Sequence, residues 1–237
     1  MMAFMATEKL KKEIKLAVFD IDGTIIRSEK GGSIFRLLDD AKNLGKDAKD
    51  LREKYQSNLT EDSLMEWSIK SFEIYQKHGL TEADIQELAK TRLKPTAGLK
   101  KIINYLHKKS IKVAVVSGSI KNAFDVFAEY NKIKVDYEFI SNYYIFDNKG
   151  QLVDKEICNY NFSGKVKAIS EICKNEGILM ENVLFVGDGD NDKEALKEVG
   201  LGIAFNTDDI EVIEAANIHI KGKSLSSVYK LLQQVIE

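Results

Sequence analysis

Short apolar runs alternate with amphipathic helical patterns over most of the chain. The runs of strand length end at glycine or polar residues and lie at about 14–20, 113–116, 183–186 and 201–205. Between them, apolar residues recur at i, i+3, i+4 and i+7, as from Leu99 to Leu106, which is typical of one buried helix face. Residues 139–157 predict a hairpin, because Asp147-Asn148-Lys149-Gly150 separates two apolar runs. Strands that alternate with helices predict an α/β fold with a Rossmann-like parallel sheet.

The segment between residues 28 and 94 interrupts this alternation directly after the first strand. It contains two helix starts, one at Thr60 and one at Thr81, where an acidic residue three positions later completes a capping box. A connection of this length is too long for a simple loop. We therefore expect residues 28–94 to form a helical cap inserted over the C-terminal edge of the sheet, with 1–27 and 95–237 as the core.

The composition narrows the class of protein. The 237 residues are 44% hydrophobic and 30% charged, and a net charge of −2 without a basic block does not favour a nucleic-acid partner. No apolar run reaches the length of a membrane span, and the first residues run into Glu8 before a signal-peptide core could form. Cys158 and Cys173 fit neither a disulfide framework nor a zinc spacing. We expect a cytoplasmic protein with reduced cysteines and no membrane partner.

Two carboxylates end the first strand, in the sequence Asp20-Ile21-Asp22-Gly23-Thr24. In open α/β sheets, ligands bind at the C-terminal ends of the strands. Neighbouring carboxylates repel each other unless a cation lies between them, and Mg²⁺ accepts such oxygen ligands while it keeps positions for water and phosphate. The pattern favours a metal-assisted phosphate site, although Asp and Gly are also ordinary turn residues at a strand end.

Polar groups follow two further strands. Ser117 and Gly118 follow the second strand, and the run Gly187-Asp188-Gly189-Asp190-Asn191-Asp192 follows a later one. Because parallel strands bring their carboxyl ends to one edge of a sheet, we expect these groups to meet. The alternating aspartates do not fit a calcium loop, since Lys193 and Val199 stand where that loop needs Gly and Glu.

Four motifs in order carry a resemblance to a known family. They are DIDGT at 20–24, VVSGS at 115–119, Lys165, and GDGDND at 187–192. The chain resembles the phosphatases of the haloacid dehalogenase (HAD) superfamily, and in particular their phosphoserine phosphatase branch. The resemblance covers nearly all of 14–232 and includes the spacing of 23 residues between Lys165 and Asp188. It implies the HAD fold with an α-helical cap after the first strand.

The resemblance also implies catalytic and metal-binding roles. Asp20 would be the nucleophile that attacks phosphorus and forms an aspartyl-phosphate, and Asp22 the general acid for the leaving oxygen and then the base for water. Asp20, the Asp22 carbonyl and Asp188 would hold Mg²⁺. Asp192 would orient the metal site and the lysine.

The remaining matched residues would surround the phosphate. The resemblance implies that Ser117 and the Gly118 amide hold phosphate oxygens, and that Asn191 contacts phosphate or substrate. Lys165 alone would be an ordinary surface lysine, but near a phosphoryl group it would neutralise charge. Asp190 replaces the alanine that the branch usually has, and we expect it in a solvated turn.

The substrate depends on the cap, where the chain departs from the branch. Glu29 lies at the spacing where phosphoserine phosphatases have a glutamate that binds the substrate amine, and the alternative is an exposed hinge residue. The branch also has an arginine in an early cap helix that binds the substrate carboxylate. No arginine occurs in the corresponding residues 63–67, and Arg52 could replace it only from a different place. Trp67 could shape a less polar pocket, or pack in the core as most helical tryptophans do.

These features predict a Mg²⁺-dependent phosphomonoesterase for a small phosphorylated metabolite. Phosphoserine is the leading candidate, and phosphocholine or phosphoethanolamine are alternative amine-bearing esters. A phosphoryl transferase or mutase would share all four motifs. A non-enzymatic binding protein on the same fold is disfavoured, because the nucleophile Asp20 is intact. The sequence leaves a monomer and a homodimer equally open.

Overall fold

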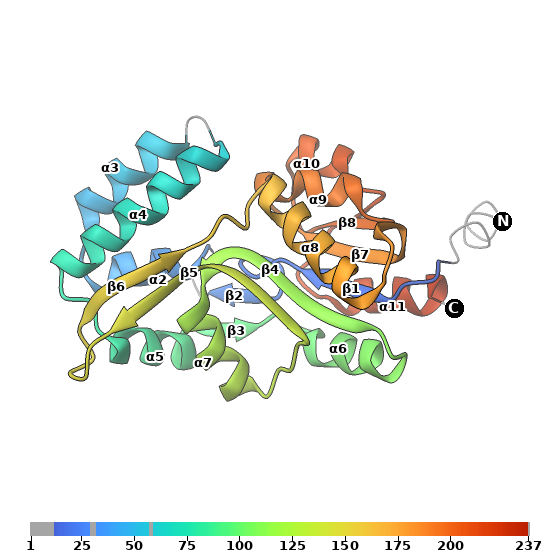
Figure 1. Cartoon of the computed structure of the whole chain (residues 1–237), viewed down its shortest axis with the longest axis horizontal. Coiled ribbons are helices and arrows are strands. Elements are labelled where there is room, and N and C mark those ends of the chain that lie inside the picture. The colour runs from blue at the N-terminus through green and yellow to red at the C-terminus, as the bar shows by residue number, and fades with distance from the viewer. Residues whose placement is uncertain (1–11, 29–31, 57–58, 237) are drawn as a thin grey trace.

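The computed structural model describes residues 12–28, 32–56 and 59–236, and its central element is a seven-stranded sheet of order β6-β5-β4-β1-β7-β8-β9 (Figure 1). The strands are β1 (Leu16–Phe19), β4 (Lys112–Ile120), β5 (Tyr137–Phe146), β6 (Leu152–Ile157), β7 (Val183–Gly187), β8 (Leu201–Phe205) and β9 (Ile218–Ile220). Every neighbouring pair is parallel except β5 with β6, which form an antiparallel hairpin. The predicted α/β fold with a mostly parallel sheet is confirmed.

Strand β1 lies in the middle of the sheet and is buried on both faces. Successive side chains of a strand point to opposite faces, so Leu16 and Val18 join one hydrophobic cluster while Ala17 and Phe19 join the other. All four side chains are at most 1% exposed. Burial on both sides explains why the strand is an unbroken apolar run without alternating polar residues.

Helices cover both faces of the sheet (Figure 1). One face packs against α8 (Ser163–Glu176), α9 (Lys193–Glu198) and α10 (Ile210–Ala215). The other packs against α6 (Leu99–Lys108), α7 (Lys121–Asn131) and α11 (Ser226–Val235). Short 3-10 turns at Met180–Asn182 and Asp190–Asp192 complete the connections on either side of β7.

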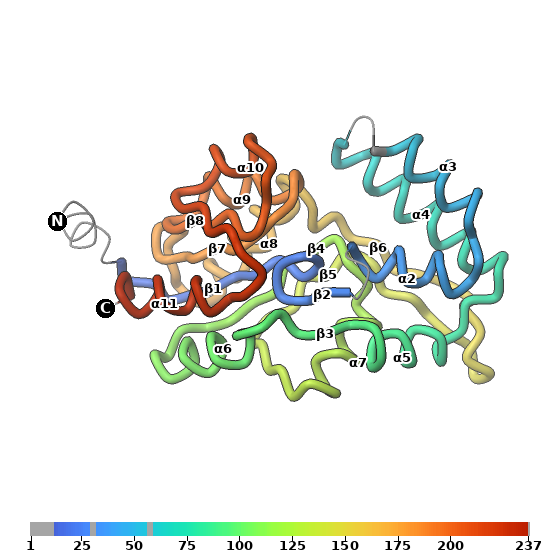
Figure 2. The backbone as a smooth tube through the Cα atoms, turned by 180° about the vertical axis from the view of Figure 1, so that it is seen from behind, coloured from blue at the N-terminus to red at the C-terminus, as the bar shows by residue number. Residues whose placement is uncertain are grey.

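Four helices lie between the first and second strands of the central sheet. They are α2 (Ile34–Ala41), α3 (Gly45–Gln56), α4 (Glu61–Lys77) and α5 (Glu82–Thr91). The chain enters this helical segment along β2 (Ile26–Ser28) and leaves it along β3 (Leu93–Pro95), and these two short strands pair antiparallel. The entry and the exit therefore lie side by side, as the backbone trace in Figure 2 shows.

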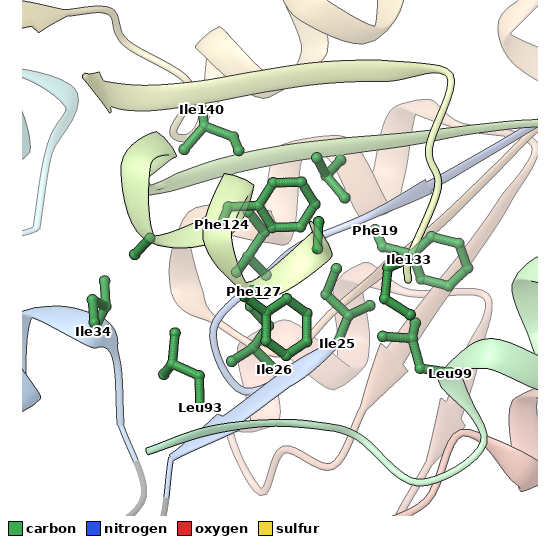
Figure 3. Packing of buried hydrophobic residues seen from close by; sticks show 14 of the residues in the cluster. Phe19, Ile25, Ile26, Ile34, Leu93, Leu99, Phe124, Phe127, Ile133 and Ile140 are labelled. Carbon is green, nitrogen blue, oxygen red and sulfur yellow. The ribbon is translucent and has the colours of Figure 1, made fainter. Parts of the chain in front are cut away.

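The helical segment shares its hydrophobic core with the sheet. Helix α5 packs against α7, and α4 packs against β6. Ile34 of α2 and Leu93 of β3 belong to the same buried cluster as Phe124 and Phe127 of α7 (Figure 3). Because one cluster continues from the sheet into the helices, the segment is stabilised by burial against the rest of the molecule.

Most local predictions agree with the structure. Strand β4, however, runs through Ser117 and Gly118 to Ile120, past the predicted end at residue 116, and several short elements were missed. Both expected helix starts are present, and Thr81 forms the capping box with Asp84. The expected hairpin is β5–β6, and its turn spans Asp147–Gly150. Strands β2, β3 and β9 have only three residues each, too few for a periodic signal. Among the residues the structure describes, no helix is long and apolar enough to span a membrane.

Candidate active site

The carboxyl ends of β1, β4 and β7 meet because β1 pairs with the other two. A cleft of about 250 Å³ opens at this edge of the sheet. Its lining includes Asp20, Asp22, Ser117, Gly118, Asp188 and Asn191. The sheet topology thus brings together the polar side chains that the sequence places at separate strand ends.

Lys165 lies beneath this cleft between two carboxylates. Its side chain is fully buried, and its Nζ donates a hydrogen bond of 2.6 Å to Asp20 Oδ1 and another to Asp192 Oδ1. Burial disfavours the charged ammonium, but Asp192 and Asp20 outweigh this effect and raise the pKa of Lys165. The lysine is therefore a fixed positive charge that holds Asp20 in place.

Asp192 also shapes the loop that follows β7. Its Oδ2 accepts hydrogen bonds of 2.9 Å from the backbone amides of Asp188 and Gly189. With Lys165 on Oδ1, this buried carboxylate is satisfied by three donors. One side chain therefore positions both the lysine and the backbone that carries Asp188.

Among the described residues, the site contains more carboxylates than positively charged side chains. Asp20, Asp188 and Asp192 each offer an oxygen within 4.8 Å of the others, and the Lys165 ammonium contacts two of the three, Asp20 and Asp192. Burial raises the pKa of Asp20 to about 7 against the pull of Lys165. Burial and the nearby Asp20 likewise raise the pKa of Asp188 well above its ordinary value. This excess of negative charge and the oxygen-only donors fit a hard divalent cation.

Asp22 lies on the side of the cleft next to the helical segment. Its carboxylate accepts hydrogen bonds from the Ser119 side chain and, at 3.3 Å, from the backbone amide of Ile34, the first residue of α2. Burial nevertheless raises its pKa. A carboxyl group with a raised pKa holds its proton more readily, which suits a general acid.

The turn after Asp22 requires a glycine. Gly23 has a φ of +86°, and a Cβ there would come within 2.1 Å of Asp188 Oδ2. Thr24 next to it donates a hydrogen bond of 2.8 Å from its hydroxyl to Asp188 Oδ1. The glycine therefore gives Asp188 the space to approach the first strand, and the threonine fixes its carboxylate.

A polar wall faces the carboxylates across the cleft. A Cβ on Gly118 would come within 2.4 Å of Asn161 Oδ1, so only glycine allows this close approach. Asn161 Oδ1 also accepts a hydrogen bond of 2.7 Å from the Asn191 side chain. The backbone amide of Ser119 donates to the Ser117 hydroxyl oxygen at 3.3 Å. Hydroxyl and amide groups of this wall are suited to bind an anion.

One residue of the helical segment reaches the helix that carries Lys165. Glu61, the first residue of α4, accepts a hydrogen bond of 2.8 Å on Oε1 from the backbone amide of Ser163, the first residue of α8. The residue before α8, Phe162, has a φ of +47° and no side-chain cap of its own. Glu61 supplies the carboxylate that such a helix N-terminus favours.

Of the two substrate residues discussed from the sequence, only Arg52 is placed by the structure, and it lies away from this cleft. Glu29 lies outside the described residues. Arg52 lies on α3, lines a separate cavity among the helices of the inserted segment, and pairs with Asp39. Asp190 begins a 3-10 turn and pairs with Lys193 at 2.5 Å.

Three contributors to the site were missed in the sequence. Thr24 and Ser119 are the last residues of two recognised motifs, and their hydroxyl groups could have indicated a role in the site. Asn161 lies outside any motif and contacts the site only through the fold.

The comparison with known families identifies the class of this protein. The family model described as haloacid dehalogenase-like hydrolase matches residues 14–200, and the chain belongs to this family. Within it, the chain is an enzyme of the phosphatase class and of the branch similar to phosphoserine phosphatases. The predicted family and enzyme class are confirmed.

Individual relatives support this branch. The phosphoserine phosphatase of Methanocaldococcus jannaschii is 29% identical over 231 residues, which are 94% of this chain and 100% of that protein. The phosphoserine phosphatase of Archaeoglobus fulgidus is 30% identical over 93% of this chain and 61% of that protein. A solved substrate-bound phosphoserine phosphatase complex is similar with a TM-score of 0.74 and 27% identity, over 93% of this chain and 99% of that chain.

Proposed function

We propose that the protein is a Mg²⁺-dependent phosphomonoesterase that acts through an aspartyl-phosphate on Asp20. The observation that carries this proposal is the position of Asp20, which directly follows β1 and is held by Lys165 at 2.6 Å within an acidic trio. In the same proposal, residues 28–94 are the cap that covers the site. The family and its phosphoserine phosphatase relatives support this mechanism.

The proposed reaction has two displacements at phosphorus. Lys165 binds Oδ1 of Asp20, so Oδ2 is the oxygen that attacks. The bond from phosphorus to the ester oxygen breaks, and Asp22 gives that oxygen its proton. Water then attacks the aspartyl-phosphate, Asp22 takes a proton from it, and the acyl phosphate bond breaks to release inorganic phosphate. The burial that raises the pKa of Asp22 favours its protonated state before the first step.

Magnesium would be held by the carboxylates of Asp20 and Asp188 and by the backbone carbonyl of Asp22. When bound, the ion would neutralise charge on the phosphoryl group and bring it to Asp20. Thr24 and Asp192 keep Asp188 in position for this role. Ser117, Gly118 and Asn191 would receive the phosphate oxygens.

Removal of the metal tests this part of the proposal. We expect EDTA to abolish phosphate release and added Mg²⁺ to restore it, because the oxygen donors of the trio prefer a hard ion. Phosphate release from a phosphomonoester can be followed before and after chelation. Activity that survives thorough chelation, or that returns with Zn²⁺ but not with Mg²⁺, would contradict the assignment.

Phosphoserine is the first substrate to test, because the named relatives are phosphoserine phosphatases. Phosphoethanolamine and phosphocholine test whether a substrate is recognised by its amine alone, without the carboxylate that phosphoserine carries. Glu29 is proposed to bind that amine, from its spacing of nine residues after Asp20.

The change Glu29→Gln should therefore weaken kcat/KM for an amine-bearing ester by roughly 1.5–3 kcal/mol, the scale of a charge-assisted hydrogen bond. An uncharged ester of similar size is the control and should change little. Equal losses on both esters would make Glu29 a structural residue, and no loss on either would remove it from the substrate site.

A further inference from the structure

A second cavity of about 490 Å³ lies among the cap helices and adjoins the cleft that contains Asp20. Its volume is within the range of about 300–1,000 Å³ that is typical of pockets for small-molecule ligands. The proposed phosphatase mechanism uses none of this space. The cavity is large enough to hold a small ligand, and the chemistry of its walls indicates which kind it would bind.

The cleft and the cavity share part of their lining, which we call the neck. Five residues line both the cleft and the cavity, and they are Ser33, Phe35, Leu59, Leu64 and Trp67. Four of them are apolar, and the fifth is an uncharged serine. A group that is joined to a phosphate at Asp20 and extends into the cavity must pass along this apolar wall.

Phe35 and Trp67 form the aromatic part of the neck. Their ring centroids are 4.3 Å apart, and the rings are tilted by 58°. Phe35 is 4% exposed and belongs to the main hydrophobic cluster, whereas Trp67 is partly buried and packs against that cluster. One part of the tryptophan side chain therefore packs against the core, and another part lines the cleft and the cavity.

The charged groups on the far wall of the cavity already have partners. Asp39 forms an ion pair with Arg52 and accepts a hydrogen bond of 3.0 Å from the Tyr75 hydroxyl. The remaining cation of the lining, Arg36, is exposed to solvent. The described wall therefore has no buried charge that requires an oppositely charged ligand group.

We propose that the cap cavity binds the leaving group of the substrate and selects phosphate monoesters of primary alcohols that carry a bulky apolar group, preferably an aromatic ring. The inference rests on the proposed phosphatase function and names its substrate class. An aromatic ring in the neck would bury apolar surface against Trp67 and Leu64. The charged body of serine would lose water there without gaining an unpaired charge among the cavity residues that the structure describes, so a preference for amine-bearing esters would have to come from Glu29, outside those residues.

Esters with matched leaving oxygens test the selection. 2-Phenylethyl phosphate, phosphoethanolamine and phosphoserine are all esters of primary alcohols, so their difference lies in the group that enters the cavity. With Mg²⁺ present, we expect kcat/KM for 2-phenylethyl phosphate to exceed that for the other two by about 10- to 100-fold, the gain expected from burying an aromatic ring. A preference for phosphoserine or phosphoethanolamine would overturn the proposal.

The change Trp67→Leu tests the neck directly. It should lower kcat/KM for 2-phenylethyl phosphate about tenfold and leave phosphoserine within about twofold. Leu179→Ala is the control, because Leu179 is an exposed apolar residue that precedes the amino end of β7 and lines neither the cleft nor the cavity. Equal losses on both esters would show that Trp67 is a packing residue, and the selection would then be rejected.

Tryptophan fluorescence gives a readout that does not depend on turnover. Trp67 is the single tryptophan of the chain, so its emission reports on the neck alone. The non-hydrolysable 2-phenylethylphosphonate should shift or quench this emission, and ethylphosphonate should not. If no ester is hydrolysed but the phosphonate still changes the emission, the proposed function fails while the cavity assignment stands. If esters are hydrolysed but the emission is unchanged, the cavity assignment fails alone.

Discussion

Replacement of Asp20 with alanine should lower kcat by roughly 10⁴- to 10⁶-fold, the scale seen when a covalent nucleophile is removed. The reason is that Asp20 directly follows β1 and contacts Lys165, and no other described carboxylate occupies this position to replace it. The measurement is phosphate release from a phosphomonoester at saturating Mg²⁺, compared with the unchanged enzyme.

The same variant should keep its fold. Strand β1 is anchored by apolar residues such as Val18 and Phe19, and Lys165 keeps Asp192 as a partner after the change. Circular dichroism and thermal unfolding would check this, with Asp208→Ala as the control because Asp208 is an exposed carboxylate. A variant that retains more than about a tenth of kcat would refute Asp20 as nucleophile.

The second large effect concerns Lys165. The change Lys165→Met should lower kcat by about 10²- to 10³-fold, the scale of one lost electrostatic contact to the transition state. It should also destabilise the metal-free protein by about 3–5 kcal/mol, since it leaves Asp20 and Asp192 buried without their cation. Lys167→Met is a matched control, because Lys167 is exposed on the same helix.

The stability of the Lys165→Met variant should depend on pH in a defined direction. Burial has already raised the pKa of Asp20 to about 7, and the loss of Lys165 would raise it further. Between about pH 4 and pH 7, the folded variant then binds more protons than the unfolded chain, whose carboxyls titrate near pH 4. The free energy of unfolding of metal-free Lys165→Met should therefore decrease as the pH rises through this window. The unchanged protein should show the same decrease up to about pH 7, because its Asp20 also holds a proton there, and the variant should lose further stability above pH 7, where the unchanged protein does not. Equal slopes for the two proteins above pH 7 would contradict the buried pair.

The sheet and the strand-end groups could be predicted because their signals are local or topological. The apolar run before Asp20 is the signature of a strand buried on both faces, and the parallel topology places Asp188 beside it without further information. The capping box at Thr81 involves residues three positions apart, so it is visible in the sequence. These features depend on few residues each.

Other parts of the site depend on contacts between distant segments. The hydrogen bond from Asn191 to Asn161 and the packing of α5 on α7 have no pattern along the chain. The apolar neck is likewise formed by Phe35 and Trp67 from different helices, so only the fold shows that they are adjacent. The sequence indicated Trp67 as either a pocket or a core residue, and the structure shows that it lines both cavities while it packs partly on the core.

The contact between Glu61 and the Ser163 amide couples two parts of the molecule thermodynamically. The first amide group of α8 is satisfied by a side chain of α4, and two residues further along, the same helix carries Lys165. A displacement of α4 would remove both the acceptor and the negative charge that stabilise this helix end. By linkage, a ligand that holds this helical segment against the sheet also favours the helix geometry that keeps Lys165 on Asp20. The free energy of binding to the segment can thereby contribute to the order of the site where the chemistry takes place.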